Sequence, residues 1–205
     1  CQKSARAGGK DSDIENIGRT SRHHSFFEML GNFSFGDYFK KEIIPWSFEL
    51  VTKDLGLDAD RISVTVFEGD ADGTVPFDEE AYDIWQNKVG IPKERIQRLG
   101  RSDNFWGPPG PTGPCGPCSE LYYDRGPDIV NDPGAEARGD RFIEIWNLVF
   151  MELFKDEAAN YSQLAAKNVD TGAGLDRLAT VIQKKNNTFE TDLLFSILEE
   201  VSRLS

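Results

Sequence analysis

The 205-residue sequence predicts an α+β domain, in which an antiparallel β-sheet is flanked by helices. Strand-like and helix-like segments follow one another in mixed succession, and strand-like segments come in adjacent pairs rather than in regular βαβ units. The composition, with 39% hydrophobic and 28% charged residues, is typical of a globular chain. A chain of this length can form one large domain with a core or two small ones.

Charge and cysteine content argue against several function classes. A net charge of −12 disfavours nonspecific binding to nucleic acid or anionic lipid. No apolar run approaches the roughly 20 residues that cross a bilayer, so we expect no membrane contact. Three cysteines, an odd number, indicate a reducing compartment rather than a disulfide framework. We expect the cytoplasm, with chloroplast and mitochondrion as alternatives.

Residues 4–31 predict two antiparallel strands joined by a polar loop. Residues 26–30 have the period-two pattern of a strand with apolar side chains on both faces, and Gly31 ends it. Arg6 would lie on the first strand and Glu28 on the second. Because burial of a lone carboxylate is costly, Glu28 must be paired or must face a ligand.

The following segments predict helices around one strand. Apolar residues at helical spacing predict a helix over 37–55, which Pro45 should kink or restart. Residues 61–67 alternate strictly and predict a strand with one solvent-facing side. Asp78 is a candidate N-cap of a helix, and residues 91–99 predict a shorter helix.

Glycine recurs at every third position from Gly107 to Gly116, which is the collagen period. Four such triplets are too few for a triple helix, so residues 102–118 predict a stiff extended loop that carries Trp106. A strand over 119–124 and a polar loop over 125–140 follow.

The remaining segments predict a strand and two helices. Residues 141–150 form the most strand-like run of the chain, with Glu144 and Asn147 on opposite faces. Residues 168–178 pass through glycines into a helix. Apolar residues at i, i+3, i+4 and i+7 over 194–201 predict a C-terminal helix.

Several charged residues lie within or next to these apolar segments. Arg6 and Arg177 are arginines that can clamp phosphate bidentately, and carboxylates beside them can hold magnesium or an ammonium group. The carboxylate candidates are Glu28, Glu120, Glu144 and Asp170. The sequence contains neither a Walker-type lysine loop nor a GxGxxG motif after a strand, so a nucleotide would lie on a sheet.

Several long motifs resemble the catalytic core of the alanyl-tRNA synthetase family, a class II aminoacyl-tRNA synthetase family. They run in order along the chain: RAGGK at 6–10, HHSFFEMLGNFSFGDYF at 23–39, SDNFW at 102–106, TGPCGPCSE at 112–120, IEIWN at 143–147, VDTG at 169–172 and GLDR at 174–177. The resemblance implies that residues 1–205 are part of the aminoacylation domain. Motif 1 and the tRNA-recognition, editing and C-terminal domains are expected to be absent from this sequence.

The resemblance also implies residue roles. ATP contacts would come from Arg6, His24, Trp106, Ile145, Trp146, Asn147, Gly174 and Arg177. Alanine contacts would come from Trp106, Asn147, Val149 and Asp170. Arg6 would bind the α-phosphate and the amino-acid carboxylate, Arg177 the γ-phosphate, and Asp170 the ammonium group. Lys10 would lie near the substrates. Ala173 and Asp176 stand where Met and Glu are common in the family.

The implied reaction forms alanyl-adenylate from L-alanine and ATP, and then transfers alanine to the 3′ end of tRNA(Ala). Mg²⁺ would accompany ATP, with Glu28 and Glu120 as candidate ligands. Zinc is expected only in the absent editing domain. Nucleic-acid binding would occur mainly through domains absent here. Because one methyl group is worth only ~1–3 kcal/mol of discrimination, serine is hard to exclude, which accounts for a separate editing domain in the family.

Other interpretations stay open at this point. Cys115 and Cys118 with His23 and His24 could form a two-Cys, two-His zinc site, but adjacent histidines do not fit the usual spacing. Two reduced thiols in a rigid loop are the simpler interpretation. The rival functions are a tRNA-independent paralogue that activates an amino acid for a carrier protein and a noncatalytic binding relative.

Overall fold

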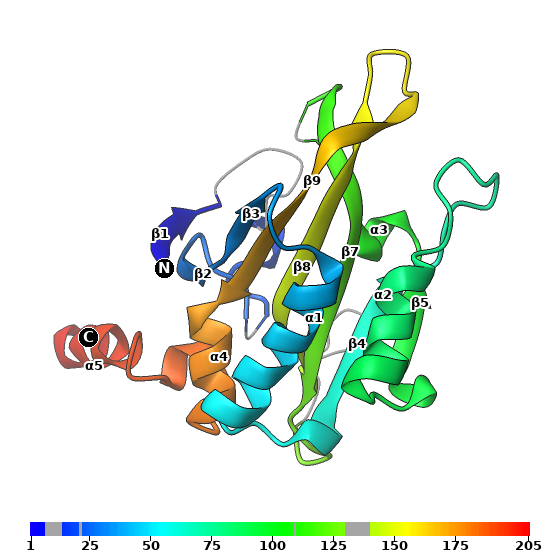
Figure 1. Ribbon diagram of the computed structural model, residues 1–205. Helices are drawn as coiled ribbons and strands as arrows, with labels where there is room; N and C mark the ends of the chain where they lie inside the picture. Colours follow the sequence, from blue (N-terminus) through cyan, green and yellow to red (C-terminus); the bar gives the residue numbers. More distant parts are fainter. Residues whose placement is uncertain (7–13, 21, 109, 130–139) are drawn as a thin grey trace. The chain divides into compact units, whose positions relative to one another are not determined.

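The computed structural model describes residues 1–6, 14–20, 22–108, 110–129 and 140–205 (Figure 1). The chain divides into two compact units. Unit 1 comprises residues 1–30, 123–145 and 173–205, and unit 2 comprises residues 31–122 and 146–172. The long strands β7 (Gly113–Asp124), β8 (Phe142–Lys155) and β9 (Tyr161–Gly174) contribute residues to both units.

Unit 1 contains the predicted hairpin. Strands β1 (Gln2–Ala5) and β2 (Phe26–Leu30) pair antiparallel, and the end of β2 pairs with the end of β9. Helix α4 (Leu175–Ile182) follows β9 directly, as the glycine-containing segment predicts. The unit also has 3₁₀ turns at Ile14–Asn16 and Thr188–Glu190, and it ends with helix α5 (Phe195–Leu204).

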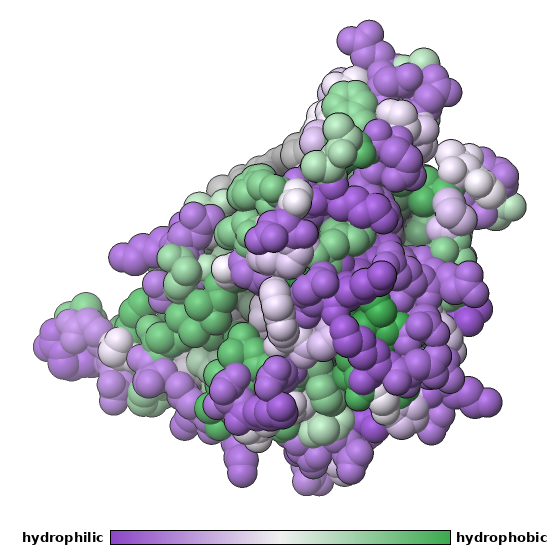
Figure 2. All heavy atoms as spheres, in the orientation of Figure 1, coloured by the Kyte–Doolittle hydropathy of each residue, from purple (hydrophilic) through white to green (hydrophobic). Residues whose placement is uncertain are grey.

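Helix α5 is confirmed, but its apolar stripe is not buried by the described residues. Phe195, Ile197 and Val201 are 45%, 59% and 58% exposed. Figure 2 shows apolar atoms at the surface over the α4–α5 region.

Unit 2 places β9, β8, β7, β4 and β5 side by side in this order, with β3 paired to β9 and β6 paired to β7. The strands not yet located are β3 (Phe33–Phe35), β4 (Ile62–Phe67), β5 (Ile96–Leu99) and β6 (Phe105–Trp106). The α-helices are α1 (Lys40–Glu49), α2 (Glu79–Asp83) and α3 (Arg101–Asn104). The short turns are π-helical at Leu50–Asp54 and Ile84–Val89, and 3₁₀ at Ala59–Arg61 and Lys93–Arg95.

The expected antiparallel sheet is mixed, because β4 and β5 are parallel. Two predictions fail at this pair. The short helix over 91–99 is wrong: one 3₁₀ turn leads into β5, whose pairing with β4 overrides the local helical preference. The solvent-facing side of 62–67 is also wrong, because every residue of β4 except Ser63 is buried. A strand with neighbours on both sides and covered faces needs no polar alternation.

Residues 113–118 belong to strand β7 rather than to the extended loop that the sequence predicts. Gly116 makes this possible, since a Cβ built on it would lie 1.9 Å from the carbonyl oxygen of Phe150. The close approach of two strand backbones therefore selects glycine here. Trp106 lies on the two-residue strand β6, where it pairs with Gly116.

Pro45 lies inside α1 and does not restart the helix. A proline cannot donate to the carbonyl of the residue four positions earlier, which is Lys41. The Lys88 ammonium replaces that donor, with Nζ 2.6 Å from the Lys41 oxygen. Asp78 caps α2 as predicted, because its carboxylate accepts from the Ala81 N–H.

Helix α1 begins with a buried cation. Lys40 Nζ lies 2.8 Å from Asp78 and 3.0 Å from Glu152, and its side chain is 3% exposed. Burial opposes the charge on Lys40, but the two carboxylates more than offset it and raise the lysine pKa. Lys40 also lies over the Phe150 ring, at 5.3 Å. The cluster thus fixes α1 against β8 and α2. None of the helices formed by the described residues is both long and apolar enough to cross a bilayer.

Replacing Lys40 with methionine should therefore destabilise the fold strongly. The change keeps the apolar stem but leaves Asp78 as a buried carboxylate without its cation, which costs about 3 kcal/mol, whereas Glu152 keeps its pair with Lys167. Urea unfolding measures the loss. The matched control is Lys53→Met, which removes an exposed pair with Glu49 and should unfold like the unmodified protein. Equal stability of the two variants would show that the Lys40 cluster does not hold α1.

Candidate functional site

Arg6 lies directly after β1 in unit 1, and its side chain is exposed. Its backbone N–H donates to the Ser25 carbonyl at 2.8 Å, which continues the pairing of β1 with β2. Its guanidinium carbon lies 5.4 Å from the centre of the Phe27 ring. A planar cation next to a half-buried aromatic ring offers charge for a phosphate and a flat surface for a base.

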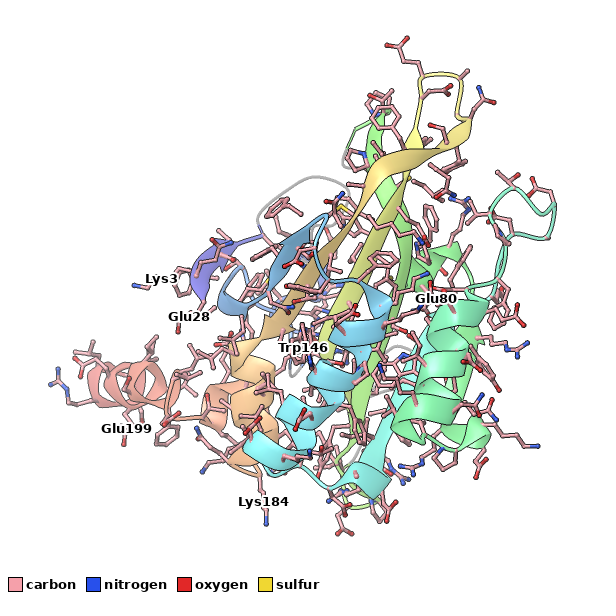
Figure 3. The ribbon with its side chains drawn as sticks, in the orientation of Figure 1. Lys3, Glu28, Glu80, Trp146, Lys184 and Glu199 are labelled. Atoms are coloured by element: carbon pink, nitrogen blue, oxygen red, sulfur yellow. The ribbon has the colours of Figure 1, made fainter. Side chains whose placement is uncertain are left out.

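Glu28 does not share this face of the hairpin. Ser4 pairs with Phe27 and Lys3 pairs with Glu28, and neighbouring residues of a strand point to opposite faces. Glu28 therefore lies beside Lys3, as Figure 3 shows, while Arg6 lies on the face of Phe27. The structure does not bring together the arginine and the carboxylate that the sequence places on this hairpin.

His24 precedes β2 and is held by the 3₁₀ turn at Thr188–Glu190. Its Nε2 lies 2.5 Å from the Thr188 hydroxyl oxygen, and its ring meets the Phe189 ring edge-on at 4.9 Å. Burial lowers the pKa of His24, and the Asp176 carboxylate only partly opposes this, while Arg177 adds to it. The imidazole is therefore neutral at pH 7, with one donor and one acceptor nitrogen.

Arg177 lies in the first turn of α4, and an ion pair with a carboxylate orients its guanidinium. Its Nη1 donates to Glu144 Oε2 at 2.8 Å, and both side chains are mostly buried. The next residue back, Asp176, is buried and accepts the Glu28 backbone N–H at 3.2 Å, which ties β2 to α4. Gly174 is the N-cap of α4, and a Cβ there would meet only Arg177 side-chain atoms at ordinary distances.

In unit 2, strand pairing places three of the predicted residues on one face of the sheet. Val149 of β8 lies opposite Asp170 of β9, and Asn147 lies opposite Gly172. Directly opposed residues of antiparallel strands share a face, and so do residues two apart. Gly172 adds no side chain across from Asn147. The opposite face carries Phe150, against which the ring of Phe39, the residue before α1, packs edge-on at 5.8 Å.

Two acceptors on this face, the Asn147 oxygen and the Asp170 carboxylate, have no donor among the described residues. The Asn147 Oδ1 atom is buried and has no hydrogen-bond partner among the described residues. Burial also raises the pKa of Asp170, and no ion pair to it is formed by the part of the chain that the structure describes. A group that brings several N–H donors and a positive charge, such as an ammonium group, satisfies both residues.

The tryptophans and Ile145 have different surroundings. Trp146 is 7% exposed, and its Nε1–H has no acceptor in the described ranges. Trp106 is half-buried and pairs with Gly116, which offers no side chain to cover the indole ring. Ile145 is 1% exposed in the core of unit 1. Its side chain therefore packs in the core, and only its backbone could contact a ligand.

The remaining candidates give no preformed metal site. Glu120 is buried and accepts the Tyr122 hydroxyl at 2.9 Å. Cys115 and Cys118 are buried cysteines that form no disulfide among the described residues. Across the residues with described positions, no group of three or more His, Cys, Asp or Glu side chains is arranged to hold a metal ion. Lys10 lies outside the described residues.

Three residues that hold predicted site residues in place are not among the predicted site residues. Phe27 lies beside Arg6, Thr188 holds His24, and Asn32 bonds to Thr171 next to Asp170. The strand pattern signals the face of Phe27. No local pattern signals the other two, because each bond joins segments more than 130 residues apart.

The family comparison identifies the class of protein. The family described as tRNA synthetases class II (A) matches residues 1–205, so the chain belongs to this family. Its mixed sheet with flanking helices is the class II catalytic fold.

Individual relatives are alanine–tRNA ligases. The chain is 50% identical over 196 residues to "Alanine--tRNA ligase, chloroplastic/mitochondrial" of Sorghum bicolor, covering 96% of this chain and 20% of that protein. It is 50% identical to "Alanine--tRNA ligase" of Petrotoga mobilis, with 100% and 22% covered, and 53% identical to that of Synechococcus elongatus, with 96% and 21% covered. The chain thus spans about a fifth of the length of the curated relatives it matches.

Asp170 should cost the folded protein stability at neutral pH. Its raised pKa means that the folded state holds the proton more tightly than the unfolded chain does, so ionisation above the folded pKa opposes folding. Asp170→Asn should therefore increase the free energy of unfolding at pH 7. The gain should vanish as the pH falls below about 4, the ordinary range of an aspartate.

Asp70→Asn is the control with the opposite sign, since the hydrogen-bonded Arg101 lowers the pKa of Asp70. It should lose stability at pH 7 and recover relative to the unmodified protein in acid. Urea unfolding across this pH range measures both variants. A stability loss for Asp170→Asn at pH 7 would contradict the interpretation of Asp170 as a carboxylate lacking a cation.

Proposed function

We propose that the protein containing this chain is an alanine–tRNA ligase. It activates L-alanine with ATP to form alanyl-adenylate and pyrophosphate, and it transfers alanine to the 3′ end of tRNA(Ala). Residues 1–205 would form part of its aminoacylation domain. The proposal is supported by identities of 50–53% to alanine–tRNA ligases over nearly the whole chain.

The hydrogen-bond acceptors on the Asp170 face would bind the amino acid. Asp170 would bind the alanine ammonium group, and the unpartnered Asn147 oxygen would accept a further N–H from it. Val149, opposite Asp170, would limit the space for the side chain, and Trp106 would contribute to the same pocket. Because a pocket of this kind separates amino acids that differ by one methyl by only ~1–3 kcal/mol, it cannot reject serine strongly.

The cationic residues of unit 1 would bind the nucleotide. Arg6 would bind the α-phosphate and the amino-acid carboxylate, and Arg177 would bind the γ-phosphate. Glu144 already orients the Arg177 guanidinium, which reduces the conformational freedom lost on binding. The Phe27 ring would offer a stacking surface, and His24 would contribute a neutral hydrogen-bonding group. The backbones of Ile145 and Gly174, with Trp146 and Asn147, would complete the ATP contacts.

Activation needs no general base. The alanine carboxylate is already ionised at neutral pH, so it can attack the α-phosphorus while the bond to pyrophosphate breaks. Catalysis would therefore come from positioning and from neutralisation of the developing negative charge by Arg6 and Arg177. Transfer then moves the alanyl group to a ribose hydroxyl of the tRNA and releases AMP.

Magnesium would arrive with ATP rather than occupy a protein cage. Mg²⁺ usually keeps several waters and binds through one or two carboxylates together with substrate phosphates. The described residues fit this mode, because they offer single carboxylates but no cluster of three. When bound, the ion would neutralise phosphate charge. Glu120 is the stronger of the two predicted ligands, since Glu28 lies on the Lys3 face of its hairpin.

Further parts of the proposed function concern tRNA, zinc and the compartment. tRNA would bind mainly through domains outside this chain, and any zinc would lie in an editing domain there. The plant relatives are named chloroplastic/mitochondrial. We propose the same organelles if the protein comes from a plant, and the cytoplasm if it comes from a bacterium.

Alanine-dependent exchange of pyrophosphate into ATP tests the first half of the reaction, and transfer of labelled alanine to tRNA tests the second. Both should occur in the full-length protein. Exchange without transfer would favour an amino-acid-activating paralogue that serves a carrier protein. Absence of exchange would favour a noncatalytic binding relative.

Arg6→Ala and Asp170→Ala should each lower the exchange rate by at least about 100-fold, because each removes a charge that complements the substrates. Arg203→Ala and Asp72→Ala are the controls: Arg203 on α5 is an exposed arginine, and Asp72 is an exposed aspartate. Both controls should retain the exchange rate. Unchanged exchange in Arg6→Ala and Asp170→Ala would refute the assignment of these residues.

A further inference from the structure

Thr171 is the neighbour of Asp170 on β9, and its side chain lies on the opposite face, where it is 2% exposed. Its hydroxyl is fully used by Asn32. It donates to Asn32 Oδ1 at 2.5 Å and accepts the Asn32 backbone N–H at 3.0 Å. A hydroxyl that donates and accepts with the same residue fixes that residue in distance and orientation.

Asn32 is in turn fixed from its other side. Its Nδ2 donates to the Tyr38 hydroxyl at 3.0 Å, and the Tyr38 ring meets the Trp46 ring of α1 edge-on at 5.3 Å. The side-chain oxygen and nitrogen of Asn32 therefore both have partners, which leaves the residue one orientation.

The backbone around Asn32 lies unusually close to β9. A Cβ built on Gly31 would lie 2.6 Å from the Thr171 carbonyl oxygen, so the segment before β3 can approach this strand only with glycine at that position. Immediately after Asn32, Phe33 pairs with Asp170. Thr171 and Asn32 thus join β9 and the start of β3 at the point where Asp170 is held between its strand neighbours Phe33 and Val149.

We propose that Asn32 and Thr171 are a positioning pair for the amino-acid site. They touch no substrate. They hold the backbone of β9 so that the Asp170 carboxylate meets the ammonium group of the amino acid, and they act through the face of the sheet opposite to it. This inference rests on the proposed function, because it assigns the pair to alanine binding and not to nucleotide binding.

Thr171→Val tests the pair, because valine keeps the shape of the side chain and removes the hydroxyl. In alanine-dependent pyrophosphate exchange by the full-length protein, the KM for alanine should rise by ~10-fold or more, since a small displacement of a binding group is costly. The KM for ATP should stay within about twofold. Thr171→Ser keeps the hydroxyl and should restore the KM for alanine to near that of the unmodified protein.

Ser47→Ala is the matched control. It removes another buried hydroxyl hydrogen bond of unit 2, from Ser47 to the Ile44 carbonyl on α1, and should leave both KM values unchanged. Asn32→Ala removes the side-chain acceptor of the Thr171 hydroxyl and the bond to Tyr38 but keeps the backbone N–H that donates to Thr171, and it should give a selective rise as well. The double variant Asn32→Ala/Thr171→Val should raise the KM for alanine by less than the product of the two single rises, because both single variants remove the same side-chain hydrogen bond.

Three results would overturn the positioning role. They are an unchanged KM for alanine in Thr171→Val, an equal rise of both KM values, and a Thr171→Ser variant that behaves like Thr171→Val. If Thr171→Val does not fold, Asn32→Ala tests the positioning role instead, by whether the KM for alanine rises while the KM for ATP does not. Failure of the proposed function is distinguishable, because the unmodified protein itself would then show no alanine-dependent exchange.

Discussion

Alternation of side chains along paired strands is the constraint on which unit 2 depends. Consecutive residues of β9 point to opposite faces, so Val169 and Thr171 enter the interior while Asp170 between them does not. The same rule orients Asn147 and Val149 on β8. A shift of the register by one residue would exchange the two faces and bury the carboxylate in the core. Packing on one face therefore determines the chemistry of the other.

The candidate site residues of the two units differ in whether they have hydrogen-bond partners. In unit 1, the Arg177 guanidinium pairs with Glu144 and the His24 imidazole bonds to Thr188, so both side chains have a partner that orients them. In unit 2, the Asn147 oxygen has no donor and Asp170 has no cation among the described residues. Side chains with partners keep their orientation without a ligand, whereas buried acceptors without donors carry an energetic cost that a ligand with donors removes.

The sequence predicted elements wherever local chemistry decides the structure. The hairpin around Phe26–Leu30 has its alternation, α2 has Asp78 as its cap, and α4 follows a glycine-containing segment. Long motifs also identified the family, and with it candidate residues whose roles stay predictions. The sequence did not predict elements that depend on a distant partner. Strand β5 exists because it pairs with β4, and residues 113–118 extend because Gly116 admits the Phe150 backbone.

Partners that are far apart in the chain limited the prediction of the site in the same way. The separation of Arg6 from Glu28 depends on hairpin register, which a motif does not contain. Thr188 lies outside the family motifs and Asn32 lies inside the one at 23–39, but neither position reveals its partner, which lies more than 130 residues away. A motif shows which residues stand together in the sequence, whereas the distant partner that holds each of them is visible only once the chain is folded.

At Pro45, a hydrogen bond missing within α1 is replaced by one from a neighbouring helical segment. The Lys41 carbonyl that the proline leaves without a donor is served by the Lys88 ammonium from the π-helical turn after α2. An ordinary helix would close this bond within its own backbone, where no reagent can alter it. Here the bond ends in a primary amine at the surface. Acylation of Lys88 would remove its charge and weaken this joint between helices while leaving the polypeptide backbone intact.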